Sequence, residues 1–358
     1  MTNEERERRE GVMFVTFAPR HFSASRRKDD VSSSDRFHLE QFEVDGDKVT
    51  ESIQRRVLSG RYARLFAAIV GTDCKVVWVW GHDVAFVASI AALFRPTLKL
   101  VWDISDVNQH LLGRGLKGRV LRLVERLFIG RADRLLLTSH RFFQEYYAAL
   151  IPGSRVRVVE NRRSTRQRCD VVPPPAQGPL KVVFAGIFRS PEVLHSIGET
   201  AAKLRGHIEF YLHGYPNRGV PEDLLVRIAK EHDNVHLCGP YDAASIGALY
   251  APAHFVWGFV DPTENDNEKW LLSNRLYDAI VTRRPVITNA DTASGDYVTA
   301  NRLGIAVPME ADAITSALTP YLDPRAAPYQ ALLAAMPDPQ TGYMSGEYAR
   351  VLEELLDE

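Results

Sequence analysis

The chain has 358 residues, more than one ordinary domain holds, because most domains contain about 100–150 residues. Hydrophobic residues make up 45% and charged residues 25% of the composition, which indicates a soluble globular protein and excludes a disordered chain. The net charge of −1 hides an asymmetry: residues 1–170 contain 30 Lys and Arg against 21 Asp and Glu, whereas residues 171–358 contain 14 against 24. The basic half indicates an anionic partner such as a membrane surface, nucleic acid or an acidic acceptor, although two domains that attract each other would show the same asymmetry.

The cysteines and the first residues bear on the cellular compartment. Cys74, Cys169 and Cys238 are far apart and odd in number, so they indicate neither a disulfide framework nor a zinc site, and a reducing cytoplasm fits best. The sequence MTNEERERREG is charged where a signal peptide would be apolar. No run approaches the roughly 20 apolar residues of a spanning helix. We therefore expect a cytoplasmic protein whose membrane contact, if any, is peripheral and at the inner face of the cell membrane.

Short apolar strands alternate with helical patterns along the chain, which is typical of a mainly parallel sheet covered by helices. In the first half, strands are expected at residues 12–18, 75–80, 99–104, 134–139 and 155–160. Helices are expected at residues 83–94, 117–129 and 141–150. The stretch 164–179 is polar and proline-rich, and we interpret it as an interdomain linker.

The alternation begins again after the linker, which predicts a second nucleotide-binding type of domain. Strands are expected at residues 180–186, 207–214, 234–239, 254–260, 285–289 and 304–308. Helices are expected at residues 191–204, 221–231, 243–250, 274–281 and 311–321. Residues 346–358 have the pattern of a final helix, which in a two-domain protein of this kind can cross back onto the first domain.

Residues 273–287, SNRLYDAIVTRRPVI, combine an amphipathic helix with a proline-led apolar strand. Asn274 and Arg275 stand at the helix start, and Asp278 follows one turn later on the same face. In an open α/β sheet, ligands gather at strand ends and helix N-termini, because free backbone N–H groups and the positive helix end attract phosphate. A cation and a carboxylate on one helix face would both be used by a nucleotide sugar.

Four segments of the second half carry a family resemblance: VVFAGIFRSPE, FYLHGYP, VHLCGPYDAASIGALYAPAHFVW and SNRLYDAIVTRRPVI. In this order they resemble the donor domain of GT-B glycosyltransferases, especially glycosyltransferase family 4. In the first half, VWDISD, ADRLLLTSHRF and VRVVENR follow the order expected of the acceptor domain. The resemblance covers most of residues 75–310.

The resemblance implies an α/β fold of two Rossmann-like domains facing across a cleft, the GT-B architecture. We accordingly expect an acceptor-binding domain at residues 1–163, a linker at 164–179 and a nucleotide-sugar donor-binding domain at 180–340. The remaining residues, 341–358, would form a C-terminal helix that can pack back on the first domain.

The sequence departs from the family pattern at four positions. The family's glutamate and lysine in the helix appear as Asp278 and Arg275, which keeps both charges. Arg283 stands where a glycine is expected, and Trp270 stands where the family has a second, partner glutamate. The acidic residues nearest to that position are Glu264, Asp266 and Glu268.

On the donor side, the resemblance and strand-end positions single out residues for binding the nucleotide sugar. Arg189 and Arg275 are candidates to stabilise negative charge on a leaving diphosphate. Arg189 could instead be a surface arginine, and Arg275 could instead pair with Asp278 on an exposed helix. Asp278 would accept hydrogen bonds from ribose hydroxyls, or serve only to solvate its helix. Tyr241 would cover a nucleobase or pack at a domain edge. Gly214 would let the ligand approach the backbone, or form only a turn.

On the acceptor side, WDISD ends a strand with Asp103 and Asp106. If the reaction inverts the sugar, a carboxylate must take the proton of the acceptor hydroxyl, and these two are the first candidates for that base. Asp103 could instead cap the following turn. His82, at the preceding strand end, is the second candidate for the base or for sugar contact. Arg20 and His21 lie in an atypical first loop, where a histidine is more often structural.

Residues 113–131 have the sequence GRGLKGRVLRLVERLFIGR, and the pattern of residues 114–131 predicts a basic amphipathic helix. Such a helix can lie on anionic lipid. The same pattern would arise if the apolar face packed on the sheet and the arginines remained in water. Both interpretations stay open, and the first would favour a lipid-linked saccharide as acceptor.

The first functional hypothesis is a glycosyltransferase that moves a sugar from a nucleotide diphosphate sugar to a hydroxyl of a saccharide or lipid-linked saccharide, in polysaccharide or glycoconjugate biosynthesis. No metal or other cofactor is expected, because no short Asp-x-Asp motif lies between strands. A nucleotide-sugar epimerase or hydrolase on the same fold is a second hypothesis. A non-catalytic GT-B-like binding subunit is a third. A nucleic-acid partner is not expected, since the basic half lacks a clustered aromatic and arginine face.

Overall fold

The computed structural model describes residues 9–17, 24–42, 53–217 and 219–358. The chain divides into two compact units: unit 1 comprises Met1–Arg166 and Met344–Glu358, and unit 2 comprises Gln167–Tyr343. The sequence placed the corresponding boundaries at residues 163/164 and 340/341. The chain therefore leaves unit 1 once and returns to it once.

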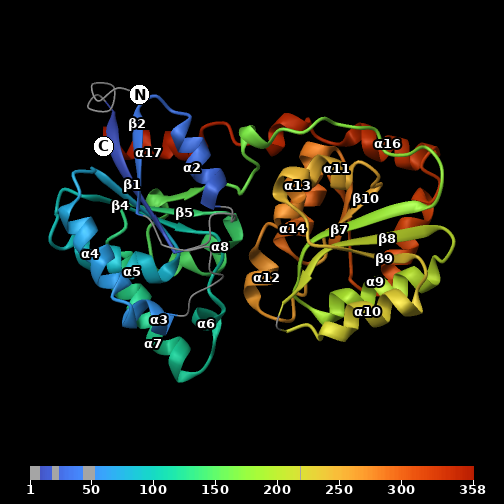
Figure 1. Ribbon diagram of the computed structural model, residues 1–358, viewed down its shortest axis with the longest axis horizontal. Coiled ribbons are helices and arrows are strands. Elements are labelled where there is room, and N and C mark those ends of the chain that lie inside the picture. Colours follow the sequence, from blue (N-terminus) through green and yellow to red (C-terminus); the bar gives the residue numbers. More distant parts are fainter. Residues whose placement is uncertain (1–8, 18–23, 43–52, 218) are drawn as a thin grey trace. The chain divides into compact units, whose positions relative to one another are not determined.

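Unit 1 contains a six-stranded parallel sheet with the strand order β2-β1-β3-β4-β5-β6 (Figure 1). The strands are β1 (Glu10–Thr16), β2 (Phe37–Phe42), β3 (Val76–Trp80), β4 (Lys99–Ile104), β5 (Arg134–Leu137) and β6 (Val156–Val158). The sequence pattern predicts all of these except β2. That strand, FHLEQF, lies at the sheet edge and interrupts its apolar residues with polar ones, so it lacks the continuous apolar run of a buried parallel strand.

The helices of unit 1 are α2 (Ala24–Ser32), α3 (Ile53–Leu58), α4 (Arg61–Gly71), α5 (His82–Ala92), α6 (Gln109–Leu112), α7 (Leu116–Ile129), α8 (His140–Glu145) and α17 (Glu347–Asp357). The helix predicted at residues 141–150 is shorter than expected, because α8 ends at Glu145 and a 3₁₀ turn follows at Tyr147–Ala149. The other two predicted helices coincide with α5 and α7.

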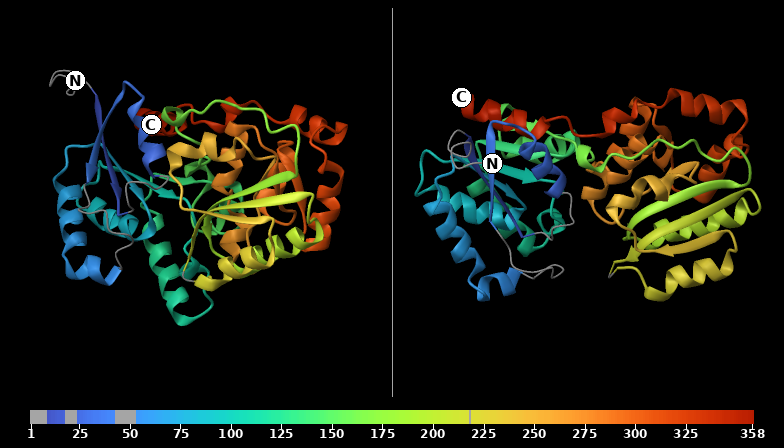
Figure 2. Two further views of the ribbon diagram at one scale, coloured as in Figure 1. Left: turned by 45° about the vertical axis from the view of Figure 1, so that its right-hand side comes forward. Right: turned by 45° about the horizontal axis from the view of Figure 1, so that its top comes forward.

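Helix α17 supplies part of the core of unit 1. Tyr348 is buried and stacks on Trp78 of β3, with 5.4 Å between the ring centroids. Asp30 of α2 accepts hydrogen bonds from the backbone N–H groups of Gly346 and Tyr348, at 2.7 and 2.8 Å. A carboxylate at a helix start satisfies donors that have no partner inside the helix. Residues 344–358 are thus an integral part of unit 1 (Figure 2).

Unit 2 contains a second six-stranded parallel sheet, with the order β12-β11-β10-β7-β8-β9. Its strands are β7 (Leu180–Phe188), β8 (Ile208–Pro216), β9 (Val235–Gly239), β10 (Phe255–Trp257), β11 (Val286–Asn289) and β12 (Gly304–Val307). All six lie where the sequence predicts them. Buried apolar clusters cover both faces of this sheet, which explains why the strands appear as continuous apolar runs.

The helices of unit 2 are α9 (Pro191–Lys203), α10 (Glu222–Glu231), α11 (Ile246–Tyr250), α12 (Asp266–Trp270), α13 (Asn274–Thr282), α14 (Ala293–Ala300), α15 (Ala311–Leu318) and α16 (Ala327–Ala335). Short or glycine-containing helices such as α12 and α14 were not predicted. In both sheets the strand order reverses next to the first long strand, between β1 and β3 in unit 1 and between β7 and β10 in unit 2. Ligands of open α/β sheets bind outside the carboxyl ends of the strands at such switch points.

Replacing Tyr348 with Ala should destabilise unit 1 by about 3–5 kcal/mol, because the substitution leaves a cavity beside Trp78. Urea denaturation followed by tryptophan fluorescence measures this loss. Tyr215→Ala is the matched control, since Tyr215 is 52% exposed and should change the free energy of unfolding little. An unchanged unfolding midpoint for Tyr348→Ala would contradict the role of α17 in this core.

Candidate functional site

The carboxyl ends of β7 and β8 are paired through two glycines that have positive φ angles. Gly186 of β7 pairs with Gly214 of β8, and their φ angles are 152° and 141°. A Cβ atom on Gly214 would lie 1.7 Å from the carbonyl oxygen of Gly186. Only glycine fits at Gly214, so the strand end predicted to admit a ligand is open backbone without side chains.

Arg275 of α13 reaches the switch point between β7 and β10. Its guanidinium group lies over the ring of Phe184, 4.4 Å from the centroid, and Nη2 donates to the carbonyl oxygens of Phe259 at 3.0 Å and Gly258 at 3.4 Å. Ser273 caps the helix by accepting a hydrogen bond from the Arg275 N–H. The buried Nε of Arg275 has no partner among the described residues. This arginine is therefore held in place while part of its hydrogen-bonding capacity stays unused.

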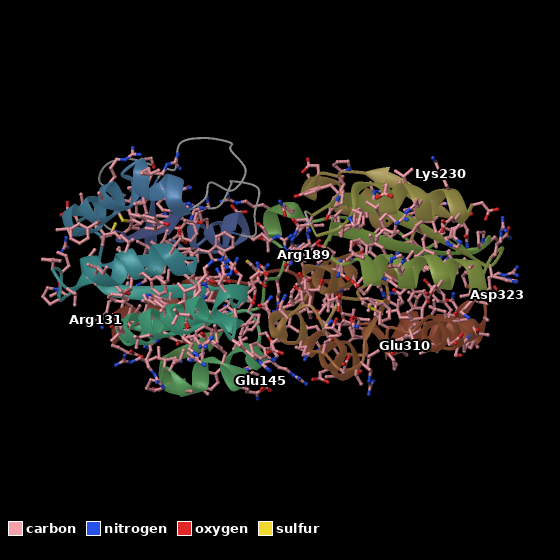
Figure 3. All side chains as sticks on the ribbon, turned by 90° about the horizontal axis from the view of Figure 1, so that it is seen from below. Arg131, Glu145, Arg189, Lys230, Glu310 and Asp323 are labelled. Atoms are coloured by element: carbon pink, nitrogen blue, oxygen red, sulfur yellow. The ribbon has the colours of Figure 1, made fainter. Side chains whose placement is uncertain are left out.

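A second cation and a carboxylate accompany Arg275. Arg189, which follows β7, is 52% exposed and lies 3.7 Å from the carboxylate of Glu268 in α12 (Figure 3 labels Arg189). Burial lowers the pKa of Arg275, and the charge of Arg189 lowers this pKa further, whereas the charges of Tyr250, Tyr241 and Glu268 oppose the shift. The structure thus brings the two predicted phosphate-binding arginines together and adds Glu268, which is buried.

The N-terminus of α9, just beyond Arg189, is surrounded by carboxylates. Ser190 caps this helix, and its Oγ lies 2.9 Å from carboxylate oxygens of both Asp261 and Glu192. Burial raises the pKa of Asp261, but hydrogen bonds from Thr263 and Ser190 outweigh burial and lower this pKa below its usual value. A charged Asp261 lies at the positive end of α9 and offsets the partial positive charge of that helix end.

The other predicted donor-side residues differ in accessibility. Asn274 is exposed at the start of α13, whereas Asp278 is buried, one turn further along the helix. Tyr241 is half-buried, and its ring lies edge-on to His213 of β8 with centroids 6.5 Å apart. Arg283, where a glycine was expected, ends α13 with φ 55°, in the left-handed region that favours glycine. The end of α13 therefore requires a left-handed backbone conformation, and Arg283 adopts it.

In unit 1, His82 follows β3 at the switch point and is held by a buried network. Its Nε2 lies 3.1 Å from the hydroxyl of Tyr147 and 3.5 Å from Glu125 of α7. Glu125 also accepts hydrogen bonds from the hydroxyls of Tyr146 at 2.5 Å and Tyr147 at 3.3 Å. The imidazole is thus oriented by Tyr147 and Glu125.

The prediction that Asp103 faces an open cleft as a base is wrong for this residue. Asp103 is completely buried and forms a 2.9 Å ion pair with Arg27, and Trp78 Nε1 donates to it at 3.1 Å. Burial raises the pKa of Asp103 to about 6 against the opposing charge of Arg27. Asp106 is exposed beyond the strand and stays a candidate. Arg20 and His21 lie outside the described residues.

Sequence reasoning missed the residues that support the site. Glu125 lies in a helix whose arginines dominated the pattern, and Phe184 was counted only as part of a strand. Glu268 was noted as one of the acidic residues near Trp270, without a role of its own. Their positions could have indicated these residues, because all three lie near the switch points that the strand order defines.

The chain resembles known proteins in sequence and in fold. No protein-family model matches the chain. The succinoglycan biosynthesis protein ExoL of Rhizobium meliloti (strain 1021) is 25% identical over 269 residues, which cover 69% of this chain and 66% of ExoL. The match thus spans just under two-thirds of ExoL's length.

Solved structures resemble the chain over almost its entire length. HepE of Anabaena in complex with UDP and glucose has a TM-score of 0.68 at 14% identity, covering 98% of this chain and 100% of HepE. The chain has the GT-B fold. Sucrose-phosphate synthase from Thermosynechococcus elongatus has a TM-score of 0.67 at 12% identity, covering 98% of this chain and 99% of the synthase.

Another structure with this likeness is UDP-GlcNAc 2-epimerase from Neisseria meningitidis bound to UDP-GlcNAc, with a TM-score of 0.59 at 14% identity over 97% of this chain and 99% of the epimerase. At such identities the likeness shows the GT-B fold alone. The resemblance to glycosyltransferase family 4 in particular stays a prediction.

Asp103→Asn should destabilise the protein by about 3–5 kcal/mol, because it leaves the Arg27 guanidinium buried without a counter-charge. Asp73→Asn is the matched control and should leave the free energy of unfolding within about 0.5 kcal/mol, because Asp73 is an exposed residue of unit 1. Chemical denaturation of both variants measures the difference. Equal stabilities would contradict the structural role of Asp103.

Proposed function

We propose that the protein is a glycosyltransferase that moves a sugar from a UDP-sugar to a hydroxyl of a saccharide or lipid-linked saccharide during polysaccharide assembly. The bond from the sugar's anomeric carbon to the diphosphate breaks, a bond from that carbon to the acceptor oxygen forms, and UDP leaves with an added negative charge. The likeness to HepE in complex with UDP and glucose, and to ExoL, supports this proposal.

The observation that carries the proposal is the pair of cations at the β7/β10 switch point. Arg275 is held against Phe184 and the Phe259 carbonyl, and the exposed Arg189 is close enough for its charge to act on Arg275. Because positive groups aimed at a leaving diphosphate stabilise the charge that develops in the transition state, these arginines suit that step. We assign the diphosphate to them and the open backbone at Gly214 to close approach of the ligand.

The proposed roles of the remaining predicted residues follow from their positions. Tyr241 is assigned to the base, and Asn274 and Asp278 to the ribose side of α13. In unit 1, His82 is assigned to the acceptor hydroxyl's proton, since Glu125 and Tyr147 orient its ring. Asp106 is the alternative base. None of these proposed roles requires a metal ion. Assays with and without a chelator test that expectation.

A nucleotide-sugar epimerase is the second candidate, because UDP-GlcNAc 2-epimerase has the same fold. The two reactions differ in their need for an acceptor. An epimerase converts the donor alone, whereas a transferase releases UDP rapidly only when an acceptor hydroxyl is present.

Arg275→Ala should weaken UDP binding by at least about tenfold, because a charge-assisted contact to a diphosphate contributes roughly 1.5–3 kcal/mol. Isothermal titration with UDP measures the affinity. The control is Arg227→Ala, which removes an exposed arginine of α10. Arg227 lies one turn before Lys230, and Figure 3 shows Lys230 far from Arg189 within unit 2. Unweakened binding by Arg275→Ala would remove this arginine from the site.

Incubation with UDP-sugars should release UDP faster when saccharide extracts containing lipid-linked intermediates are added, and the sugar should appear in the extract. Chromatography of nucleotides and radiolabelled glycans measures both products. Conversion of the donor to an epimer without an acceptor would favour the second candidate. If no nucleotide sugar binds or turns over, the proposed enzyme function fails.

A further inference from the structure

Helix α7 of unit 1 presents a stripe of large apolar side chains to solvent. Leu116, Val120, Leu123 and Leu127 are 79%, 50%, 59% and 66% exposed. Their spacing of four, three and four residues places all of them on one helix face. Figure 1 shows α7 at the lower margin of unit 1.

The opposite face of α7 is fixed to the body of unit 1. Gly118, Glu125 and Ile129 are buried there. A Cβ atom on Gly118 would lie 2.1 Å from the carbonyl oxygen of Gly113, and Glu125 is bonded to Tyr146. Turning the apolar stripe inward would separate the Glu125 carboxylate from the Tyr146 and Tyr147 hydroxyls and from His82. The alternative in which the apolar face of this helix packs on the sheet is therefore wrong.

Basic side chains border the stripe. Arg119 and Arg126 lie on one side of it and Lys117 on the other, and all three are exposed. Arg114 and Arg131 stand beyond the two ends of the helix and are also exposed. The sole acidic residue between positions 114 and 131 is the buried Glu125. The exposed surface of α7 thus combines apolar residues with positive charge alone.

We propose that α7 is an interfacial helix that binds unit 1 to an anionic lipid bilayer. The four apolar side chains would enter the boundary between headgroups and acyl chains, and the bordering cations would lie at the level of the lipid phosphates. No helix among the described residues is long and apolar enough to cross a membrane, so the contact is on the surface. The proposal goes beyond the transfer reaction and does not depend on it.

Charge favours a bilayer over a second copy of the chain as the occupant of this surface. A symmetric pair of α7 helices would place Arg119 and Arg126 near the same residues of the other copy, with no exposed carboxylate on the helix to neutralise them. Like charges at an interface without partners oppose association. An anionic lipid surface instead offers a negative group for each cation.

Co-sedimentation with vesicles tests the proposal. The native protein should bind vesicles of phosphatidylcholine mixed with phosphatidylglycerol, should not bind phosphatidylcholine alone, and should dissociate as salt is added. Leu123→Glu should weaken binding by at least about tenfold, because one leucine no longer enters the bilayer. The combined variant Lys117→Gln, Arg119→Gln and Arg126→Gln should weaken binding by about 100-fold, at about a factor of five per cation.

Val226→Glu in α10 is the matched control, since Val226 is an exposed apolar residue on a helix of unit 2, and it should bind vesicles like the native protein. All substituted positions are exposed, and unchanged thermal melting confirms that each variant is folded. Failure of the native protein to bind anionic vesicles overturns the proposal. Vesicle binding by Leu123→Glu that equals binding by the native protein overturns it too. A third contrary result is a native dimer that Leu123→Glu dissociates, with no vesicle binding by either protein. None of these results bears on nucleotide-sugar turnover, which uses no vesicles.

Discussion

The glycine pair Gly186 and Gly214, at the paired ends of β7 and β8, is the constraint on which the candidate site depends. Both residues have positive φ angles, a Cβ atom on Gly214 would lie 1.7 Å from the carbonyl oxygen of Gly186, and Nη1 of Arg275 lies 3.6 Å from where a Cβ atom on Gly186 would be. The arginine loses water in exchange for an aromatic face and two backbone carbonyls. Positive charge is thereby held at the point where the strand order reverses, and Arg189 adds an exposed cation whose charge acts on Arg275.

Buried charges also position the elements of unit 1. Arg27 of α2 pairs with Asp103 of β4, and Asp30 of the same helix binds the start of α17. Glu125 connects α7 to the tyrosines near α8 and to His82. A buried charge is costly unless it is paired, so each pair admits few alternative arrangements of its elements. The same network that orients the imidazole also determines which face of α7 meets solvent.

Strand positions could be predicted because parallel strands buried on both faces are continuous apolar runs, as in 180–186 and 99–104. Edge strand β2 and the short helix α12 could not, since neither has a long apolar period. Strand-end positions and a family resemblance could single out Arg189 and Arg275 as candidate residues. The burial of Asp103 does not, because its partner Arg27 lies 76 positions away in a segment with no recognised motif. Long-range pairs of this kind leave no local pattern.

The discontinuity of unit 1 has a consequence for biogenesis. Residues 344–358 complete its core but come after all of unit 2 along the chain, so a ribosome synthesises the second Rossmann-like unit before the first has all of its parts. Domains commonly fold from the N-terminus onward during translation. Here the core of unit 1 is completed only after unit 2 has been synthesised. Until Tyr348 arrives, Trp78 and its apolar neighbours lack their cover, and this interval is when chaperones would bind the nascent chain.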